Sequence, residues 1–246
     1  MPDMMIEAEH LFKRYGTRLV VDDLSLHVNV GDVLGFIGPN GAGKTTTMKM
    51  ISGVMPPYAG RVRIDGIDIE AEPRLAKSRI GFLPENAPLH MTMTVRAFLA
   101  YTGRLHGFSG RELARRVDRA IERCALKDAA GQEIESLSKG YKRRVCLAQS
   151  ILHDPKALIM DEPTDGLDPN QKRQIRELIL SLKEETAVII STHILEEVDA
   201  VCSRVFLLCK GKTLFDGAKD EFRAKADALH TDLAGLFAVM TEGEQA

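Results

Sequence analysis

The chain has 246 residues, of which 44% are hydrophobic, so it holds enough apolar material for the full core of one α/β domain. Its formal net charge of −2 excludes a strongly basic surface, and no nucleic-acid partner is expected. Four cysteines without a CxxC or Cys/His cluster predict reduced, mostly buried thiols in a cytosolic protein, and no apolar run approaches the ~20 residues that cross a bilayer.

The N-terminal part of the chain consists of short strand-like runs separated by turns. Residues 1–16 (MPDMMIEAEHLFKRYG) carry acidic side chains and no continuous apolar stretch, so no signal peptide is expected. Strands are predicted over Met5–Leu11, Leu24–Val30 and Arg61–Ile64, with turn signals between them. These runs predict an antiparallel β-layer that leads into a parallel core.

A glycine-rich loop follows the continuous apolar strand Val33–Ile37. Its sequence, GPNGAGKT, fits the phosphate-binding pattern G-x-x-x-x-G-K-[ST] of nucleoside triphosphate sites. The glycines let successive backbone N–H groups point inward, and the helix that begins near Gly43 adds the positive end of its dipole. Lys44 is placed to reach the β- and γ-phosphates, and the Thr45 hydroxyl is placed to ligate Mg²⁺. The predicted nucleotide-binding residues of this loop are Gly38, Asn40, Gly41, Gly43, Lys44, Thr45 and Thr46.

Helical patterns dominate the segment from residue 86 to about 154. A first helix is predicted after the N-cap Thr94, and a second after a capping box formed by Ser109 and Glu112. A third helix is predicted over about Gly140–His153. The apolar face predicted for the first helix consists of Val95, Phe98, Leu99, Thr102 and Leu105. These helices predict a helical insertion inside an α/β domain.

Two carboxylates follow the continuous apolar strand Ala157–Met160. Asp161 lies at the carboxyl end of this strand, where the sites of open α/β sheets form, and can hold Mg²⁺ through water. Glu162 can polarise the water that attacks the γ-phosphate. The alternative is an ordinary polar strand end, but the phosphate loop upstream favours a metal and hydrolysis site.

The last third of the chain returns to alternating helix and strand. Asp168 is the N-cap of a predicted helix that precedes the strand Ala187–Ser191. A strand pair is predicted over Val205–Leu208 and Lys212–Phe215, and a short Ala-rich helical tail beyond Asp220.

The predicted fold class is α/β, with a P-loop NTPase (RecA-like) core, an antiparallel β subdomain and an inserted helical subdomain. The core and its β subdomain are expected over residues 1–85 and 155–220, the helical subdomain over 86–154 and the tail over 221–246.

The motifs GPNGAGKT, LSKGY, LIMDEP and TDGLDP, followed by a histidine at 193, resemble the nucleotide-binding subunits of ATP-binding-cassette (ABC) proteins in content and order over nearly the whole chain. The resemblance implies ATP and Mg²⁺ as cofactors. It implies that Tyr15 stacks on adenine and that His193 is a switch residue that hydrogen-bonds the γ-phosphate. Ser138 and Gly140 match the signature that contacts ATP held by a second subunit, so ATP is expected between two chains.

The sequence departs from the family pattern at a few positions. Glu85 replaces the usual glutamine and is a further candidate ligand for Mg²⁺. Lys139 and Tyr141 replace the commoner glycine and glutamine of the signature, and Asp165 stands where serine or asparagine is commoner. The SKGY spelling and the PEN loop are similar to a branch of bacterial export-type ATPases that includes those acting in gliding motility and nitrous-oxide-reductase maturation.

The resemblance implies an ATP-hydrolysing subunit of an ABC transporter. It implies a homodimer at the cytoplasmic face of the cell membrane, beneath separate integral membrane permease subunits that dock on residues 85–107. The main alternative is a soluble ABC ATPase that regulates a cytosolic assembly. A small-molecule kinase with the same phosphate loop is a third reading, but it explains neither LSKGY nor His193.

Overall fold

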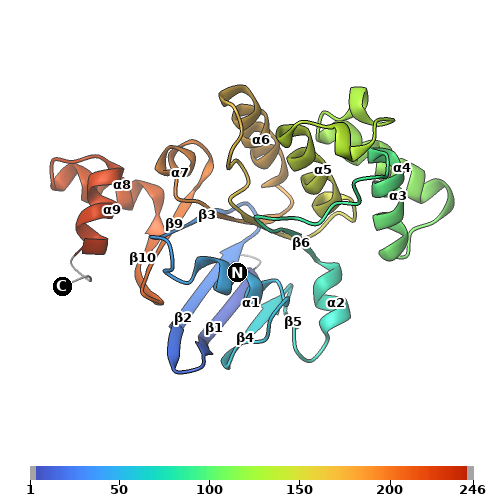
Figure 1. The fold of residues 1–246 in the computed structure, drawn as a ribbon. Coiled ribbons are helices and arrows are strands. Elements are labelled where there is room, and N and C mark those ends of the chain that lie inside the picture. Colours follow the sequence, from blue (N-terminus) through green and yellow to red (C-terminus); the bar gives the residue numbers. More distant parts are fainter. Residues whose placement is uncertain (1–3, 243–246) are drawn as a thin grey trace.

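The computed structural model describes residues 4–242, which form two β-sheets with helices around them (Figure 1). The smaller sheet is antiparallel and has the strand order β2-β1-β4-β5. Its strands are β1 (Met4–Tyr15), β2 (Arg18–Asn29), β4 (Ala59–Ile64) and β5 (Ile67–Asp68). β1 and β2 are longer than predicted because several register shifts let their ladder continue to a turn at Gly16.

The larger sheet has the strand order β10-β9-β3-β8-β7-β6. Its strands are β3 (Val33–Ile37), β6 (Ile80–Leu83), β7 (Ala157–Asp161), β8 (Ala187–Ser191), β9 (Arg204–Cys209) and β10 (Lys212–Ala218). β10 pairs antiparallel with β9, and the other neighbours pair in parallel. β3 lies between β8 and β9, so the chain connections diverge on its two sides. The carboxyl end of β3 is therefore a topological switch point, where α/β sheets form their ligand crevices.

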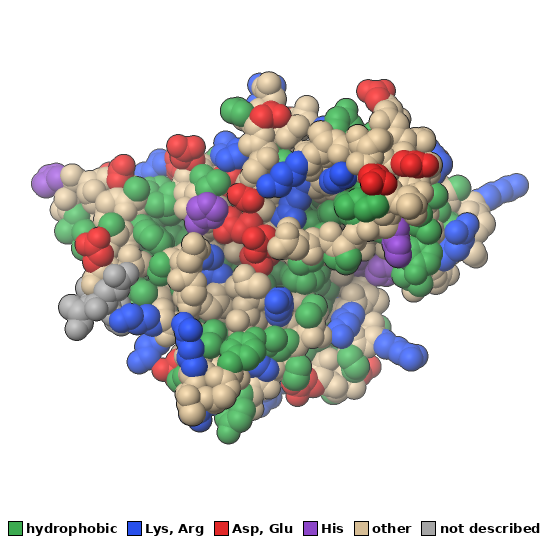
Figure 2. Space-filling view, viewed as in Figure 1, with side chains coloured by type: hydrophobic (Ala, Val, Ile, Leu, Met, Phe, Trp, Pro, Cys, Tyr) green, Lys and Arg blue, Asp and Glu red, His purple; other side chains and the backbone are tan. Residues whose placement is uncertain are grey.

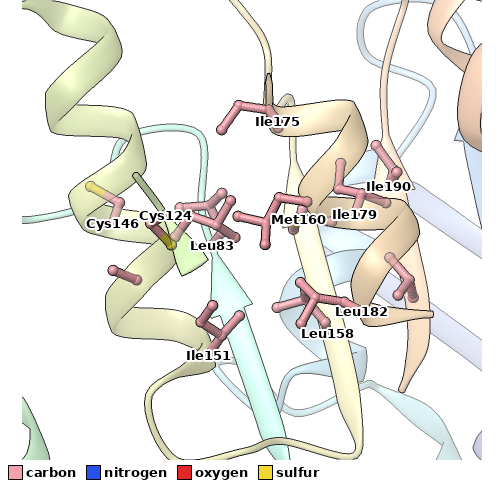
Figure 3. Close-up of a cluster of buried hydrophobic side chains, with 14 of the residues drawn as sticks. Leu83, Cys124, Cys146, Ile151, Leu158, Met160, Ile175, Ile179, Leu182 and Ile190 are labelled. Carbon is pink, nitrogen blue, oxygen red and sulfur yellow. The ribbon is translucent and has the colours of Figure 1, made fainter. Parts of the chain in front are cut away.

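Both faces of the larger sheet are buried, which explains the continuous apolar strands. Along β7, Leu158 and Met160 pack toward α5 and α6, whereas Ala157 and Ile159 face α1 and the smaller sheet. Figure 3 shows the first of these cores, with side chains of β6, β7, α5 and α6 pointing toward one another. The phosphate-loop helix thus lies between the two sheets.

The helices are α1 (Lys44–Ile51), α2 (Pro73–Ser78), α3 (Val95–Leu105), α4 (Gly110–Arg123), α5 (Lys139–Ile151), α6 (Pro169–Leu182), α7 (Leu195–Val201), α8 (Lys219–Ala228) and α9 (Leu233–Glu242). α3, α4 and α5 pack together beside β6 (Figure 1), as an insertion between β6 and β7. α2, β6 and α7 were not predicted, because each is shorter than the window in which periodicity is clear.

Two expectations for the helical segment were wrong. Leu105 does not belong to the apolar face of α3, since it is the last helical residue and 70% exposed. Ser109 is the N-cap of α4, but its side chain makes no capping hydrogen bond. Glu112 accepts a bond from Arg116 Nε at 3.0 Å instead, so a local ion pair replaces the predicted capping box. The capping of α3 by Thr94 is confirmed, with Ala97 N donating to Thr94 Oγ1.

Up to residue 242, the C-terminal tail holds two helices rather than one, and Phe222 of α8 and Leu236 of α9 are buried. Residues 243–246 of the predicted tail and residues 1–3 of the N-terminal segment lie outside the described part of the chain. Within residues 4–242, no helix combines the length and the apolar character that a membrane crossing requires.

Candidate active site

The phosphate loop connects β3 to α1 with a backbone that needs glycine. Gly43, the N-cap of α1, has φ 110°, and no side chain caps this helix terminus. A Cβ on Gly38 would lie 2.2 Å from the backbone oxygen of Leu208. The loop can approach β9 this closely because Gly38 has no side chain. Because α1 begins without a side-chain cap, its first-turn N–H groups are left for an anion.

A cavity of about 470 Å³ opens at this loop. It brings together most of the predicted site residues from four separate parts of the chain. Its lining comprises Arg18, Val20, Asn40, Gly41, Gly43, Lys44, Thr45, Thr46, Glu85, Asp161, Glu162, Asp165 and His193. The space-filling view shows acidic side chains gathered near the middle of one face, with basic side chains around them (Figure 2).

Lys44 and the acidic residues of β7 face one another in this cavity. Lys44 is buried, and its Nζ donates to the Gly38 carbonyl at 2.6 Å. Burial lowers the pKa of Lys44, while the carboxylates of Glu162 and Asp161 oppose that shift. A buried ammonium beside uncapped N–H groups gives the cavity a positive floor, which suits a polyphosphate.

Glu162 lies in an unusual backbone conformation immediately after β7. Its φ is 49°, in the left-handed region that non-glycine residues rarely adopt, and such strain concentrates at functional sites. Its Oε2 lies 3.0 Å from Nδ1 of His193. Burial raises the pKa of Glu162, and the hydrogen bond with His193 partly offsets this. The carboxylate is thus a stronger base than an exposed glutamate, and His193 orients it.

The donor atoms around the cavity suit Mg²⁺ bound together with a triphosphate. Thr45, Glu85 and Asp161 all line the cavity and offer oxygen ligands, which Mg²⁺ prefers. Among residues 4–242, no group of three or more His, Cys, Asp or Glu side chains is arranged to hold a metal by itself. The residues therefore fit an ion that takes its remaining ligands from phosphate and water, as Mg²⁺ does in nucleotide sites.

Four predicted site residues lie outside the cavity lining. Gly38 does not line the cavity, but its carbonyl accepts from Nζ of Lys44, which does. Tyr15, at the end of β1, is 49% exposed and donates to Met55 Sδ at 3.3 Å. Ser138 is the exposed N-cap of α5, and Gly140 is buried against Gln171 of α6. Their predicted contacts with adenine and with a second chain's ATP remain predictions.

Two of the sequence departures contact each other. Lys139 Nζ lies 3.4 Å from Asp165 Oδ2, so the first residue of α5 is paired with the loop after β7. Asp165 also lines the cavity. The pairing gives a structural reason for Asp165, for which the sequence alone suggested none.

Two buried charged residues at this edge of the sheet were missed by the sequence analysis. Arg143 of α5 donates only to backbone carbonyls. Glu197 of α7 accepts from the hydroxyls of Thr164 and Thr192, and so joins the loop after β7 to the residue before His193. The available signal was weak: Glu197 stands one helical turn before the buried Val201, a position that an exposed charge fits equally well.

Comparisons with known proteins agree with this geometry. The sequence model of the ABC transporter family matches residues 21–165. The Nod factor export ATP-binding protein I of Paraburkholderia xenovorans (strain LB400) is 39% identical over 219 residues, which cover 89% of this chain and 72% of that protein. The linearmycin resistance ATP-binding protein LnrL of Bacillus subtilis (strain 168) is 36% identical over 88% of this chain and 70% of its own length.

Solved structures show the same fold. A structure described as the ATP-binding subunit of an ABC transporter superposes with a TM-score of 0.87 at 28% identity, covering 96% of this chain and 99% of that one. The structure of cbiO1 from Clostridium perfringens, described as part of the ABC transporter complex cbiONQ, gives a TM-score of 0.81 at 27% identity, covering 93% and 94%. With its P-loop cavity and these relatives, the chain belongs to the ABC transporter family of ATP-binding proteins and is an ATPase.

Proposed function

We propose that the chain is the ATP-hydrolysing subunit of an ABC exporter. In this proposal it forms a homodimer at the cytoplasmic face of the cell membrane, attached to separate integral membrane permease subunits. The observation that carries the proposal is the cavity that gathers the phosphate loop, Asp161, Glu162 and His193. The export direction rests on the SKGY and PEN spelling and on relatives named for export and resistance. The narrower similarity to the branch of gliding motility and nitrous-oxide-reductase maturation rests on that spelling alone.

The residues take distinct roles in this proposal. Lys44 and the first-turn N–H groups of α1 hold the β- and γ-phosphates, with Asn40, Gly41, Gly43 and Thr46 shaping the loop around them. Thr45 and Asp161, with Glu85, would hold Mg²⁺ directly or through water. When bound, Mg²⁺ neutralises charge on the β- and γ-phosphates.

Hydrolysis is assigned to Glu162 and His193. Glu162 accepts a proton from the attacking water, and His193 both orients that carboxylate and reaches the γ-phosphate. Ser138 and Gly140 of one chain complete the site of the other, and Tyr15 stacks on adenine. Closure around ATP and reopening after hydrolysis would then drive the permease, because ATP has a higher affinity for the closed dimer.

The boundaries of the subdomains belong to the same proposal. The core covers residues 1–85 and 155–220 and binds nucleotide, and the helical subdomain covers 86–154 and carries the signature. Residues 85–107, at the junction of the two, form the docking surface for the permease. The solved structure described as part of the cbiONQ complex supports such an arrangement by analogy.

The second candidate function is a soluble ABC ATPase that regulates a cytosolic assembly. It uses the same cavity and the same hydrolysis, and differs only in the partner. A small-molecule kinase is the weakest alternative, because it gives no role to the signature helix.

The test is co-purification of the tagged chain from its own cells in mild detergent, with and without ATP, followed by mass spectrometry. We expect a stoichiometric membrane protein with several spans. Recovery with soluble partners alone, under conditions that preserve a known membrane complex, would favour the cytosolic alternative.

A further inference from the structure

The guanidinium of Arg143, on α5, donates all of its hydrogen bonds to backbone carbonyls. The side chain is 9% exposed, and Nε, Nη1 and Nη2 all donate. Its acceptors, at 2.6–3.1 Å, are the carbonyl oxygens of Pro84, Glu85, Asp161, Glu162 and Pro163. A guanidinium has five N–H donors in a fixed planar fork, so this set of acceptors matches its full donor capacity.

Burying this charge is costly unless its surroundings compensate for it. Within residues 4–242, no carboxylate lies within ion-pair distance of Arg143, so the carbonyl dipoles alone satisfy it directly. The nearby carboxylates of Asp161, Asp165 and Glu85 favour the charge from a distance, but its hydrogen bonds depend on the position of the backbone. If one group of carbonyls moves, the guanidinium must follow or lose hydrogen bonds in a buried site.

The contacts fix the two peptide groups that flank Glu162. Arg143 Nη2 donates to the Asp161 carbonyl at 2.6 Å, before Glu162, and to the Glu162 carbonyl at 2.7 Å, after it. Between these bonds, Glu162 has its strained φ of 49°. Holding both neighbouring peptides fixes the direction of the Cα–Cβ bond of Glu162, from which its carboxylate reaches His193.

The same guanidinium also holds a segment that the sheet does not hold. The ladder between β6 and β7 ends at the pair Leu83 and Met160. Beyond that pair, Nη1 of Arg143 donates to the Pro84 and Glu85 carbonyls at 2.9 Å. One side chain on the signature helix thus spans the loop after β6 and the loop after β7, at the point where strand pairing stops.

We propose that Arg143 is a positioning residue that couples the loop around Glu85 to the orientation of the Glu162 carboxylate. A displacement of the Pro84–Glu85 backbone moves the guanidinium, which rotates the peptides on either side of Glu162. This inference rests on the proposed function, in which residues 85–107 receive the permease and Glu162 activates water. Through Arg143, a permease bound at residues 85–107 would change the orientation of the Glu162 carboxylate.

The adjacent residue provides a matched control. Arg144 is 8% exposed on the same helix, but it donates to one carbonyl, that of Ala125, at 3.0 Å and lies over the ring of Tyr141. The full chain should be compared with Arg143→Lys, Arg143→Gln and Arg144→Lys. A lysine keeps the charge but has three donors on one atom, so it cannot reach both loops.

We expect Arg143→Lys to lower kcat by about 10²-fold, because a small misplacement of a catalytic group costs about that much. The affinity for mant-ATP should stay within about threefold, since Lys44 and the phosphate loop are unchanged. Arg144→Lys should lower the thermal stability by about as much as Arg143→Lys does, while its kcat stays within about twofold of the wild-type value. An unchanged kcat in Arg143→Lys, or an equal loss in Arg144→Lys, would overturn the proposal. Arg143→Gln, which removes the charge, replaces Arg143→Lys if the latter does not fold.

Amide hydrogen exchange separates this inference from the proposed function. In Arg143→Lys, exchange should rise together in residues 84–87 and 161–165, and in neither segment for Arg144→Lys. If the wild-type chain fails to hydrolyse ATP, the proposed function fails, yet joint exchange still supports the coupling. Faster exchange confined to one of the two segments would overturn it.

Discussion

The two sides of the nucleotide cavity are held in place by different kinds of contact. On the phosphate-loop side the contacts are local: Lys44 Nζ bonds the Gly38 carbonyl, and Thr47 Oγ1 bonds the Gly43 carbonyl at 3.0 Å. On the β7 side, Glu162 and its neighbours are held by side chains distant in sequence, namely Arg143 and Glu197. The first side is therefore held mainly within one motif, with one long-range bond from Gly211 N to the Ala42 carbonyl at 2.9 Å. The second side depends on the packing of α5 and α7 against the sheet.

The largest effect that separates the two sides is expected from Glu162→Gln. Removing the base should lower kcat by about 10²- to 10⁴-fold. ATP affinity should persist because the phosphate loop is intact, and the variant should accumulate as an ATP-dependent dimer in sedimentation experiments. Glu196→Gln, an exposed glutamate of α7, is the control. Near-normal hydrolysis by Glu162→Gln would remove Glu162 from its role, and a monomer at saturating ATP would count against the homodimer.

Acid should loosen the far end of α5 before it affects the phosphate loop. His153 Nε2 lies 2.9 Å from the Ile80 carbonyl, and its ring stacks on His106 near Arg116 and Asp154. Burial, with the charge of His106, lowers the pKa of His153 from 6.5 to about 4. The unfolded chain therefore binds the extra proton between these pH values, and stability present above pH ~6.5 is lost on the way to ~4.

This loss is on the order of 3 kcal/mol for one such group. Denaturant unfolding between pH 7 and 4 should show the slope, and His153→Gln should flatten it. Hydrogen exchange should rise in α5 at a higher pH than in α1. Identical pH profiles for the wild type and His153→Gln would contradict the assignment.

Glu197→Gln tests the long-range support of the β7 side. Both hydroxyls that contact Glu197 are donors, so an amide nitrogen would face a donor and leave a buried group unpaired. The free energy of unfolding should fall by about 1–3 kcal/mol. Hydrolysis should fall more than ATP affinity, because Thr192 precedes His193. Glu196→Gln should change neither quantity, and equal effects of the two variants would refute the link.

Substitutions of Glu85 test whether its carboxylate contacts Mg²⁺ or only lines the edge of the cavity. Glu85→Gln keeps an oxygen ligand and should retain hydrolysis, whereas Glu85→Ala should lose about tenfold in kcat, or about 1.4 kcal/mol. Steady-state rates over a range of Mg²⁺ concentrations would measure this. Equal activity of the alanine variant would exclude the proposed contact.

The smallest effect is expected from the pair of Lys139 and Asp165. Their side chains are 67% and 53% exposed, so the pair contributes about 0.2–1 kcal/mol and weakens with salt. A double-mutant cycle of Lys139→Ala and Asp165→Ala at low and high salt measures this coupling. A coupling of zero at low salt would show that the pair does not hold the loop after β7.

The phosphate-loop side was predictable from sequence because its geometry is local. Gly43 needs its φ of 110°, and the fixed spacing to Lys44 carries that requirement into the sequence. The apolar strands around it were equally clear. The capping of α4 was not, because Glu112 had a second partner one turn away in Arg116.

The sequence by itself determined the α/β class, the phosphate loop and the order of the motifs, since each depends on neighbouring residues. The tertiary structure decided that Arg143 and Glu197 are buried, and which backbone carbonyls and threonine hydroxyls they contact. Nothing in the adjacent sequence separates Arg143 from Arg144, yet one contacts two loops and the other a single carbonyl. The reason is that a buried charge is satisfied by groups that folding brings near it, and for Arg143 those groups lie 18 to 59 residues away.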